Sequence, residues 1–367
     1  MLVRYVSLRD FRCYEHAKAE LGPGLTVITG PNGAGKTNLL EAVYFGCTAR
    51  SCRTTNEREV VRFGASATRV VIVAEAQDGM HELAVGFIPG EPKRMRVDGA
   101  VVDRLLDVEQ RPLVSVFLPD RLELVKGPPA LRRAHLDQFV AALWPARVAT
   151  RRSYAQALAQ RNALIARIRS GVARRDSLAS WDAELARHAI ALIVDRRAAI
   201  EALTESFTSL SAELGFDGTV TVRYRPRSRA SDAAELAEEL AGRLDGDLDR
   251  GFTDHGPHRD EVVLTLDGRE LRSYGSQGQQ RLALLSLLLA ERQTIAQRRP
   301  APPLMLLDDV MSELDGDRRR ALADLLRASG GQSVITTTDL DHVPGAADVG
   351  VAHLAVSGGR LLYEAAA

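Results

Sequence analysis

Two spacings of apolar residues divide the chain into strand-rich and helix-rich stretches. Before about residue 115, short runs that are apolar or alternate with polar residues predict strands. These runs are Leu25–Thr29, Val70–Ala74 and Leu83–Phe87, and Met95–Val102 is expected to form a hairpin with Asp98-Gly99 at its tip. One run of helical spacing follows the first of them and contains Leu39, Leu40, Ala42, Val43 and Phe45. This part of the chain therefore combines strands with one helix.

The pattern changes between residues 119 and 215, where Ala, Leu and Arg dominate. Apolar residues there step by three and four: Ile200, Leu203, Phe207, Leu210 and Leu214. This spacing predicts one helix from Trp181 to Leu214, about 50 Å long at about 1.5 Å per residue. We expect it to pack antiparallel on a helix over 148–169. A helical bundle and a true coiled coil both account for the spacing.

Strand-like runs return at 219–224, 262–266, 304–307 and 333–336, with helices predicted at 281–297 and before Ala328. The order predicts an α/β nucleotide-binding head with a mixed sheet, split by a helical insertion. We expect residues 1–118 and 252–367 to form the head and residues 119–251 the insertion.

Composition narrows the class of protein. The 367 residues are 45% hydrophobic and 26% charged, which suits a soluble protein of two or three domains. No window approaches the roughly 18 apolar residues of a membrane span, and the N-terminus lacks the apolar block of a signal peptide. Cys13, Cys47 and Cys52 form no CxxC pair, so we expect reduced thiols in a cytoplasmic protein.

The net charge is zero, but the charges are unevenly distributed. The basic segment, Lys126–Arg175, holds eleven Lys and Arg residues and one acid, Asp137. Residues 231–250 are acidic. Arginines offer bidentate donors to phosphates, so the basic segment is a candidate for contacts with the DNA backbone, including Arg151, Arg152 and Arg161. A solvated helical face accounts for the same pattern. Because few aromatic residues lie in the segment, contact with a duplex or with a junction between duplex and single strand fits better than base stacking.

A phosphate-binding loop is the clearest chemical motif. It consists of Gly30, Pro31, Asn32, Gly33, Ala34, Gly35, Lys36 and Thr37. Glycines let backbone N–H groups wrap around phosphate oxygens at the start of a helix. The motif predicts that Lys36 reaches the β- and γ-phosphates and that Thr37 binds Mg²⁺.

The apolar strand 304–307 ends in Asp308 and Asp309. A carboxylate at the end of a buried strand needs a cation or strong donors, and Mg²⁺ held by Thr37 and Asp308 would meet that need. Asp309 is then the candidate to polarise the attacking water. Without the phosphate loop, a helix cap or a solvated edge would explain both acids.

The third motif is the loop Ser276–Gln280, which opens an apolar helix. Alone it reads as a helix cap. In combination with the other two motifs it resembles the signature loop of ABC-type ATPases, in which Ser276, Gly278 and Gln279 would reach a nucleotide held by a second copy.

The order of these motifs resembles the ABC/SMC head family, and within it the RecF family of bacterial DNA repair proteins. The resemblance is carried by residues 117–128, by 256–260 and by 274–281, and also by 8–12 and 37–42. It implies an ABC/SMC-type ATPase head that binds ATP and Mg²⁺, forms an ATP-dependent homodimer, binds DNA and works with a RecR-type mediator in recombinase loading. Asp309 stands where most ABC ATPases have Glu, and its shorter side chain implies slow hydrolysis.

Two residues in this comparison keep open roles. Arg53 corresponds to a phosphate-contacting arginine of SMC heads or is a surface residue, and His258 is a core or inter-loop histidine. Three other functions remain alternatives: a transporter ATPase, an SMC-type structural protein, and a DNA-binding module whose nucleotide site is structural. The 271 residues between Lys36 and Asp308 count against the transporter. The insertion is too short for extended SMC arms.

Overall fold

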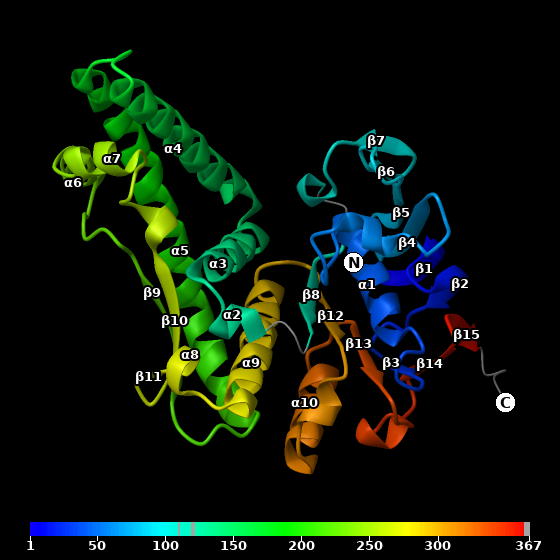
Figure 1. Ribbon diagram of the computed structural model, residues 1–367. Coiled ribbons are helices and arrows are strands. Elements are labelled where there is room, and N and C mark those ends of the chain that lie inside the picture. Colours follow the sequence, from blue (N-terminus) through cyan, green and yellow to red (C-terminus); the bar gives the residue numbers. More distant parts are fainter. Residues whose placement is uncertain (109–110, 119–121, 363–367) are drawn as a thin grey trace. The chain divides into compact units, whose positions relative to one another are not determined.

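A computed structural model describes residues 1–108, 111–118 and 122–362 (Figure 1). The chain divides into two compact units. Unit 1 comprises Met1–Arg121, Glu213–Gly215 and Ile295–Ala367, and unit 2 comprises Leu122–Ala212 and Phe216–Thr294.

Unit 1 contains an antiparallel sheet of six strands in the order β2-β1-β4-β5-β6-β7. Its strands are β1 (Leu2–Phe11), β2 (Tyr14–Glu20), β4 (Thr68–Ala76), β5 (Gly79–Phe87), β6 (Arg94–Val97) and β7 (Ala100–Val102). The Asp98-Gly99 turn joins β6 to β7 with φ values of 49° and 81°. Both values suit a tight hairpin turn, so the hairpin expected there is confirmed.

The second sheet of unit 1 has the order β15-β14-β3-β13-β12-β8. Its strands are β3 (Leu25–Thr29), β8 (Val114–Phe117), β12 (Leu304–Leu307), β13 (Ser333–Thr337), β14 (Ala352–Ser357) and β15 (Arg360–Leu362). All neighbours pair in parallel except β14 and β15. The carboxyl ends of β3, β13 and β12 therefore meet at one edge, where ligands bind in open parallel sheets.

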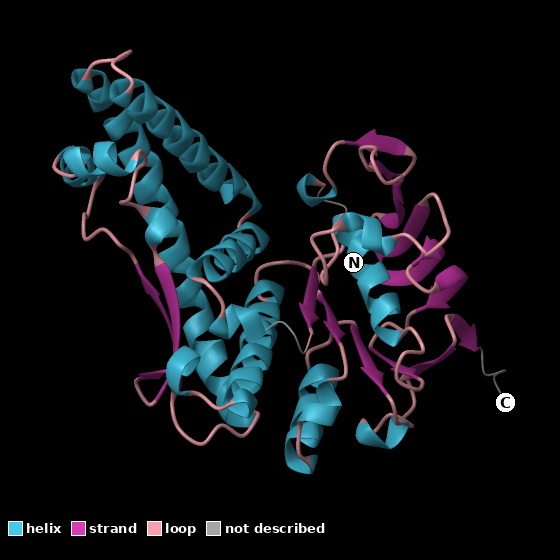
Figure 2. Cartoon of the chain, viewed as in Figure 1, coloured by secondary structure: helices cyan, strands magenta, loops and turns pink. Residues whose placement is uncertain are grey.

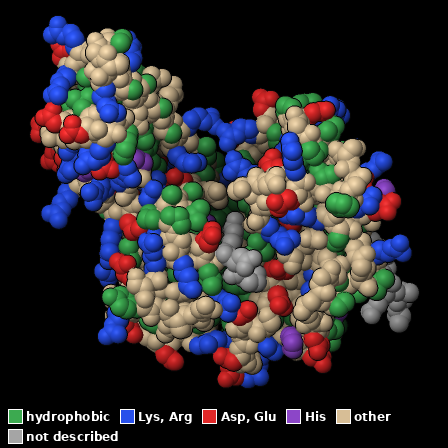
Figure 3. Space-filling model, viewed as in Figure 1, with side chains coloured by type: hydrophobic (Ala, Val, Ile, Leu, Met, Phe, Trp, Pro, Cys, Tyr) green, Lys and Arg blue, Asp and Glu red, His purple; other side chains and the backbone are tan. Residues whose placement is uncertain are grey.

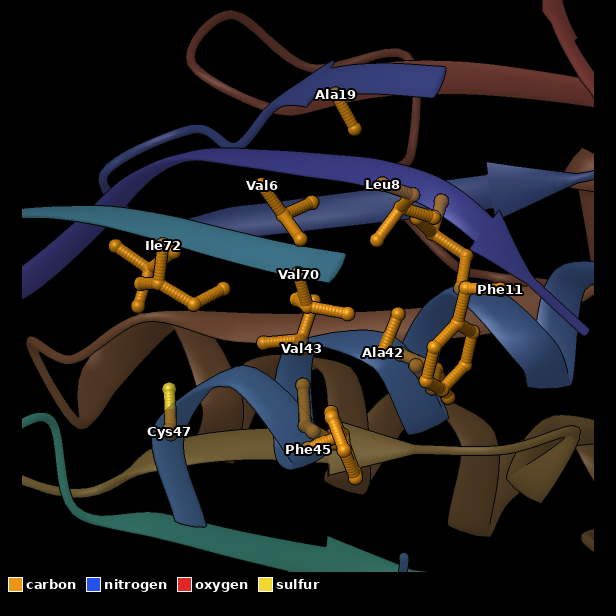
Figure 4. Packing of buried hydrophobic residues seen from close by; sticks show 14 of the residues in the cluster. Val6, Leu8, Phe11, Ala19, Ala42, Val43, Phe45, Cys47, Val70 and Ile72 are labelled. Atoms are coloured by element: carbon orange, nitrogen blue, oxygen red, sulfur yellow. The ribbon is translucent and has the colours of Figure 1, made fainter. Parts of the chain in front are cut away.

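Helix α1 (Lys36–Thr48) contacts strands of both sheets, and α10 (Gly316–Ala328) begins at an Asp315 cap. Figure 4 shows Val43 of α1 facing Val70 of β4 within the buried apolar cluster. The Phe11 and Phe45 rings lie 5.6 Å apart, between centroids. Cys47 is fully buried in this cluster, and burial raises the pKa of its thiol to about 12.

Unit 2 is mostly helical, with a small three-stranded sheet (Figure 2). Its helices are α2 (Glu123–Lys126), α3 (Pro129–Leu143), α4 (Val148–Arg169), α5 (Ala179–Glu213), α6 (Ala233–Ala241), α7 (Leu244–Arg250), α8 (Leu271–Tyr274) and α9 (Gln277–Ala296). The antiparallel sheet has the order β11-β10-β9, with β9 (Val220–Arg225), β10 (Glu261–Leu266) and β11 (Arg269–Glu270). The long helix predicted from apolar spacing is confirmed as α5, and the helix expected over 148–169 is confirmed as α4. The two pack together through residues such as Tyr154 and Leu185.

The division into units differs from the expected one for residues 252–294. We expected them in the head, but they belong to unit 2. The physical reason is pairing, since β10 forms a six-residue ladder with β9 and Glu261 binds Arg132 of α3. The expected boundary at residue 119 lies outside the described residues.

Candidate nucleotide site

The phosphate loop connects β3 to α1, as its motif predicts. Gly35 precedes α1 with φ 117°, and no side chain caps this helix end. The first backbone N–H groups of α1 are therefore available to an anion, and the helix dipole favours negative charge there. A Cβ on Gly33 would meet nothing within 4 Å, so the tip of the loop is open.

Neighbouring turns hold the base of the loop. The Tyr14 hydroxyl donates to Gly35 O at 3.0 Å, and Gly359 N donates to Ala34 O at 2.9 Å. At Gly30, φ is 152° and a Cβ would lie 2.2 Å from Val356 O. Glycine is thus required at this position by conformation and by space.

Lys36 binds the loop itself. Its Nζ donates to Gly30 O at 2.7 Å and to Pro31 O at 3.1 Å. Burial lowers the pKa of Lys36, whereas the nearby Asp309 and Asp308 raise it. The ammonium group is therefore held on the inner side of the loop, close to the two carboxylates.

Thr37 and Asp308 meet although they are far apart in sequence. The Thr37 hydroxyl lies 2.9 Å from both carboxylate oxygens of Asp308, and Thr336 of β13 donates to Asp308 Oδ1 at 2.7 Å. Burial raises the pKa of Asp308, and the hydrogen bonds from Thr336 and Thr37 lower it. A divalent cation would stabilise the ionised carboxylate in this place.

Asp309 has an unusual backbone and a free oxygen. Its φ is 44°, in the left-handed region, and its N–H donates to Thr336 Oγ1 at 2.9 Å. Within the described residues, the buried Oδ1 of Asp309 has no hydrogen-bond partner. The Thr336 hydroxyl thus orients both acids, a role that the sequence analysis missed and that no motif marks.

Arg53 lies beside the phosphate loop. It donates to Asn38 Oδ1 at 2.9 Å in the first turn of α1 and lies 3.5 Å from Glu41. Glu41 is fully buried and accepts two hydrogen bonds of 2.8 Å from Arg12. Two arginines therefore lie at this helix end; Arg12 was not singled out from the sequence.

The loop Ser276–Gln280 caps α9. Gln279 N donates to Ser276 Oγ at 3.2 Å, and Ser276 N donates to Gln279 Oε1 at 2.9 Å, a reciprocal capping box. The cap reading is confirmed within the chain. Ser276 and Gly278 remain exposed, and a Cβ on Gly278 would meet only Ser276 Oγ at 4.0 Å.

The structure corrects the list of DNA-contact arginines. Arg161 has no exposed surface, and it binds Asp182 at 2.6 Å, Asp247 at 2.7 Å and Thr253 at 2.8 Å. Burial raises the pKa of Asp182, which the ion pair with Arg161 counteracts. Arg161 was wrongly expected on a DNA-binding face, because helical spacing alone does not reveal the buried acids opposite it.

Other arginines of the basic segment are also paired. Arg132 binds Glu261 at 2.9 Å, Arg147 binds Asp195 at 3.0 Å, and Arg175 binds Asp245 at 2.7 Å. The basic segment and the acidic stretch 231–250 therefore partly neutralise each other within unit 2. This weakens the case for the basic segment as the DNA-binding surface.

His258 is part of the interior of unit 2. Its Nε2 lies 2.9 Å from Thr253 O, which can only accept, so Nδ1 accepts from the Tyr154 hydroxyl at 2.6 Å. Burial lowers the pKa of His258. A neutral, structural histidine fits these contacts.

A resident metal site made by protein ligands alone is absent from the described ranges, which hold no cluster of three or more His, Cys, Asp or Glu suited to an ion. Thr37 and Asp308 still fit Mg²⁺, because this ion commonly takes one or two protein ligands plus phosphate oxygens.

In the part of the chain that the structure describes, no helix has the length and apolarity needed to cross a membrane.

Comparison with known proteins identifies the family. "DNA replication and repair protein RecF" of Anaeromyxobacter sp. (strain Fw109-5) is 38% identical over 366 residues, covering 97% of each chain. The chain belongs to the RecF family. The RecF protein of Myxococcus xanthus is also 38% identical, over 98% of this chain and 96% of its own.

Solved structures agree with this assignment. RecF described with ATP in the RecFOR pathway has a TM-score of 0.86 at 27% identity and covers 99% of this chain and 98% of its own. A family model described as an AAA domain matches residues 5–81. An Smc head from Pyrococcus furiosus, at 19% identity and a TM-score of 0.62, shares the fold over 98% of this chain and 95% of its own. The fold is therefore that of an ABC/SMC-type ATPase head, as expected.

Proposed function

We propose that this RecF-family chain is an ATP-dependent DNA-binding protein of recombinational repair. ATP binding closes a homodimer on gapped or junction DNA, and slow hydrolysis releases it. The observation that carries the proposal is the convergence of Thr37, Asp308 and Asp309 at the uncapped start of α1. In this proposal the protein works with a RecR-type mediator in recombinase loading, replication restart and SOS induction.

Each residue of the site has a distinct role in the proposal. The phosphate loop and Lys36 bind the phosphates of ATP, and Thr37 with Asp308 would hold Mg²⁺. The cation would neutralise phosphate charge and orient the nucleotide. Asp309 orients a water through its unpaired oxygen, held in place by Thr336.

We propose residues 1–118 and 295–362 as the ATP-binding part, a revision that leaves residues 252–294 to unit 2.

The exposed loop Ser276–Gly278 would complete the site of a second copy. Its capping box fixes the backbone at the start of α9, so the serine and glycine are presented in a defined conformation. Slow turnover is expected because the Asp309 side chain is one carbon shorter than Glu.

The first test is molecular mass by light scattering, with and without Mg-ATP. We expect the wild type to shift from monomer to dimer with ATP. Asp309→Asn should accumulate as the dimer, since it keeps the shape of the site but cannot activate water. The matched control Asp317→Asn, at an exposed position of α10, should behave as wild type. A mass that ignores ATP in every variant would contradict the proposal.

Ser276→Arg tests the second copy's part in the site. We expect this variant to bind ATP with wild-type affinity and yet stay monomeric, because a large cation would occupy the space for the partner's phosphates. Ser180→Arg, a matched change at an exposed position of α5, should still dimerise. Nucleotide titration and light scattering measure both properties, and normal dimerisation of Ser276→Arg would exclude a role in trans.

A further inference from the structure

A row of exposed arginines follows the outer strand of the small sheet in unit 2. Exposure alternates from residue 219 to residue 230: the even positions are buried or half-buried, and most odd positions are exposed. Four successive exposed positions hold Arg223, Arg225, Arg227 and Arg229. The first two lie on β9, which pairs only with β10 in the described sheet. We call these four residues the arginine row.

The arginine row retains most of its charge. Arg225 binds Glu270 at 2.9 Å, whereas Arg223, Arg227 and Arg229 have no acidic partner among the residues that the structure describes. Two acids at the start of β10 have other partners: Glu261 binds Arg132, and the buried Asp260 binds Arg196, Tyr224 and the backbone N–H of Arg227. On the face shown in Figure 3, Lys and Arg side chains gather over the region where Figure 1 draws β9.

Edge protection explains only part of the row. Charged side chains on an outer strand discourage pairing with other chains. However, Arg227 and Arg229 follow the end of β9, where there is no strand edge to protect. Arg227 lies at a bend just beyond the strand, and because Arg227 and Arg229 alternate with the buried Ser228 and Ala230, both arginines are exposed.

We infer that the arginine row binds the phosphate backbone of duplex DNA. At about 3.3 Å per residue, Arg223 and Arg225 lie about 6.6 Å apart along β9, and Arg227 and Arg229 continue on the exposed side of the segment that follows. Duplex DNA carries one phosphate charge per about 3.4 Å of axis on each strand, so a group of unpaired arginines on one face meets a dense row of acceptors. The exposed positions of the row carry no aromatic side chain, and Tyr224 is turned to Asp260 on the other face. Contact with the backbone, blind to sequence, follows from this chemistry.

This inference rests on the proposed DNA-binding function, and it locates DNA binding at the arginine row rather than at the basic segment.

The test compares two triple variants. The row variant is Arg223→Gln/Arg227→Gln/Arg229→Gln. The matched control removes three exposed arginines of the basic segment and is Arg167→Gln/Arg169→Gln/Arg174→Gln. Binding of two duplexes of unrelated sequence is measured by fluorescence anisotropy with Mg-ATP over a range of salt concentrations.

We expect the row variant to bind both duplexes about tenfold or more weakly and to lower the slope of log affinity against log salt by about 2.7, or about 0.9 per lost contact. The control should bind as wild type. Equal DNA binding by the row variant and wild type would overturn the inference, as would a larger loss in the control. If the wild type itself binds no DNA, the proposed function fails instead.

Because the three substituted side chains are exposed and form no ion pair among the described residues, the row variant should fold normally, so weaker DNA binding can be told apart from a folding defect. Thermal unfolding of the row variant should match that of wild type. The single variant Arg229→Gln, outside the strand, should lower the salt slope by about 0.9 without touching the sheet. An unchanged slope in this variant would remove Arg229 from the row and contradict its extension beyond β9.

Discussion

Lys36→Met is expected to weaken ATP binding about 10- to 150-fold and to remove the ATP-dependent dimer. The Lys36 ammonium group donates to Gly30 O of the loop. It is the one cation of the phosphate-loop motif, and it interacts with both Asp308 and Asp309. A hydrogen bond between charged groups contributes about 1.5–3 kcal/mol, so losing it weakens binding by about 10- to 150-fold. Titration with a fluorescent ATP analogue measures this loss.

The fold should survive this change. Methionine keeps the length of the side chain and removes a charge whose burial lowers the pKa of Lys36. Thermal unfolding without nucleotide should therefore change little, while the stabilisation by ATP disappears. Lys126→Met, at an exposed position of α2, is the matched control and should bind ATP normally. An ATP-dependent dimer of Lys36→Met would refute the assignment of the phosphate loop.

Arg161→Met is expected to destabilise unit 2 strongly. It would leave the buried carboxylates of Asp182 and Asp247 without their common cation. Removing one partner of a buried ion pair costs about 3–5 kcal/mol. In a unit of this size, that loss corresponds to a melting temperature lower by about 10 °C.

The control for Arg161→Met lies on the same helix. Arg167→Met, at an exposed position of α4, should unfold within about 0.5 kcal/mol of wild type in a denaturant titration. If both variants unfold alike, the buried cluster contributes little to stability.

Several features of the site could be predicted because they are local. The glycines at 30 and 35 are required by backbone angles within the loop itself, and the helix start places Lys36 beside them. The capping box at Ser276 involves residues only three positions apart. Apolar spacing likewise predicted α5, since a helix face repeats over a few residues.

Other features depended on contacts between distant positions. The sequence placed residues 252–294 in the head, but strand pairing with β9 draws them into unit 2. It placed Arg161 among the DNA contacts, but Asp182 and Asp247 bury it. In each case the partner lies too far along the chain for any periodicity to specify it.

The same difference between local and distant contacts applies to the nucleotide site, whose residues are marked in the sequence but meet only in the tertiary structure. The sequence alone contains the loop and the two acids, because residue types and short-range spacing define them. Only the parallel order β3-β13-β12 brings Thr37 to Asp308 and inserts Thr336 beside both acids. Packing likewise determines which arginines are exposed without an acidic partner. A buried arginine such as Arg161 needs acids that only the folded chain brings to it.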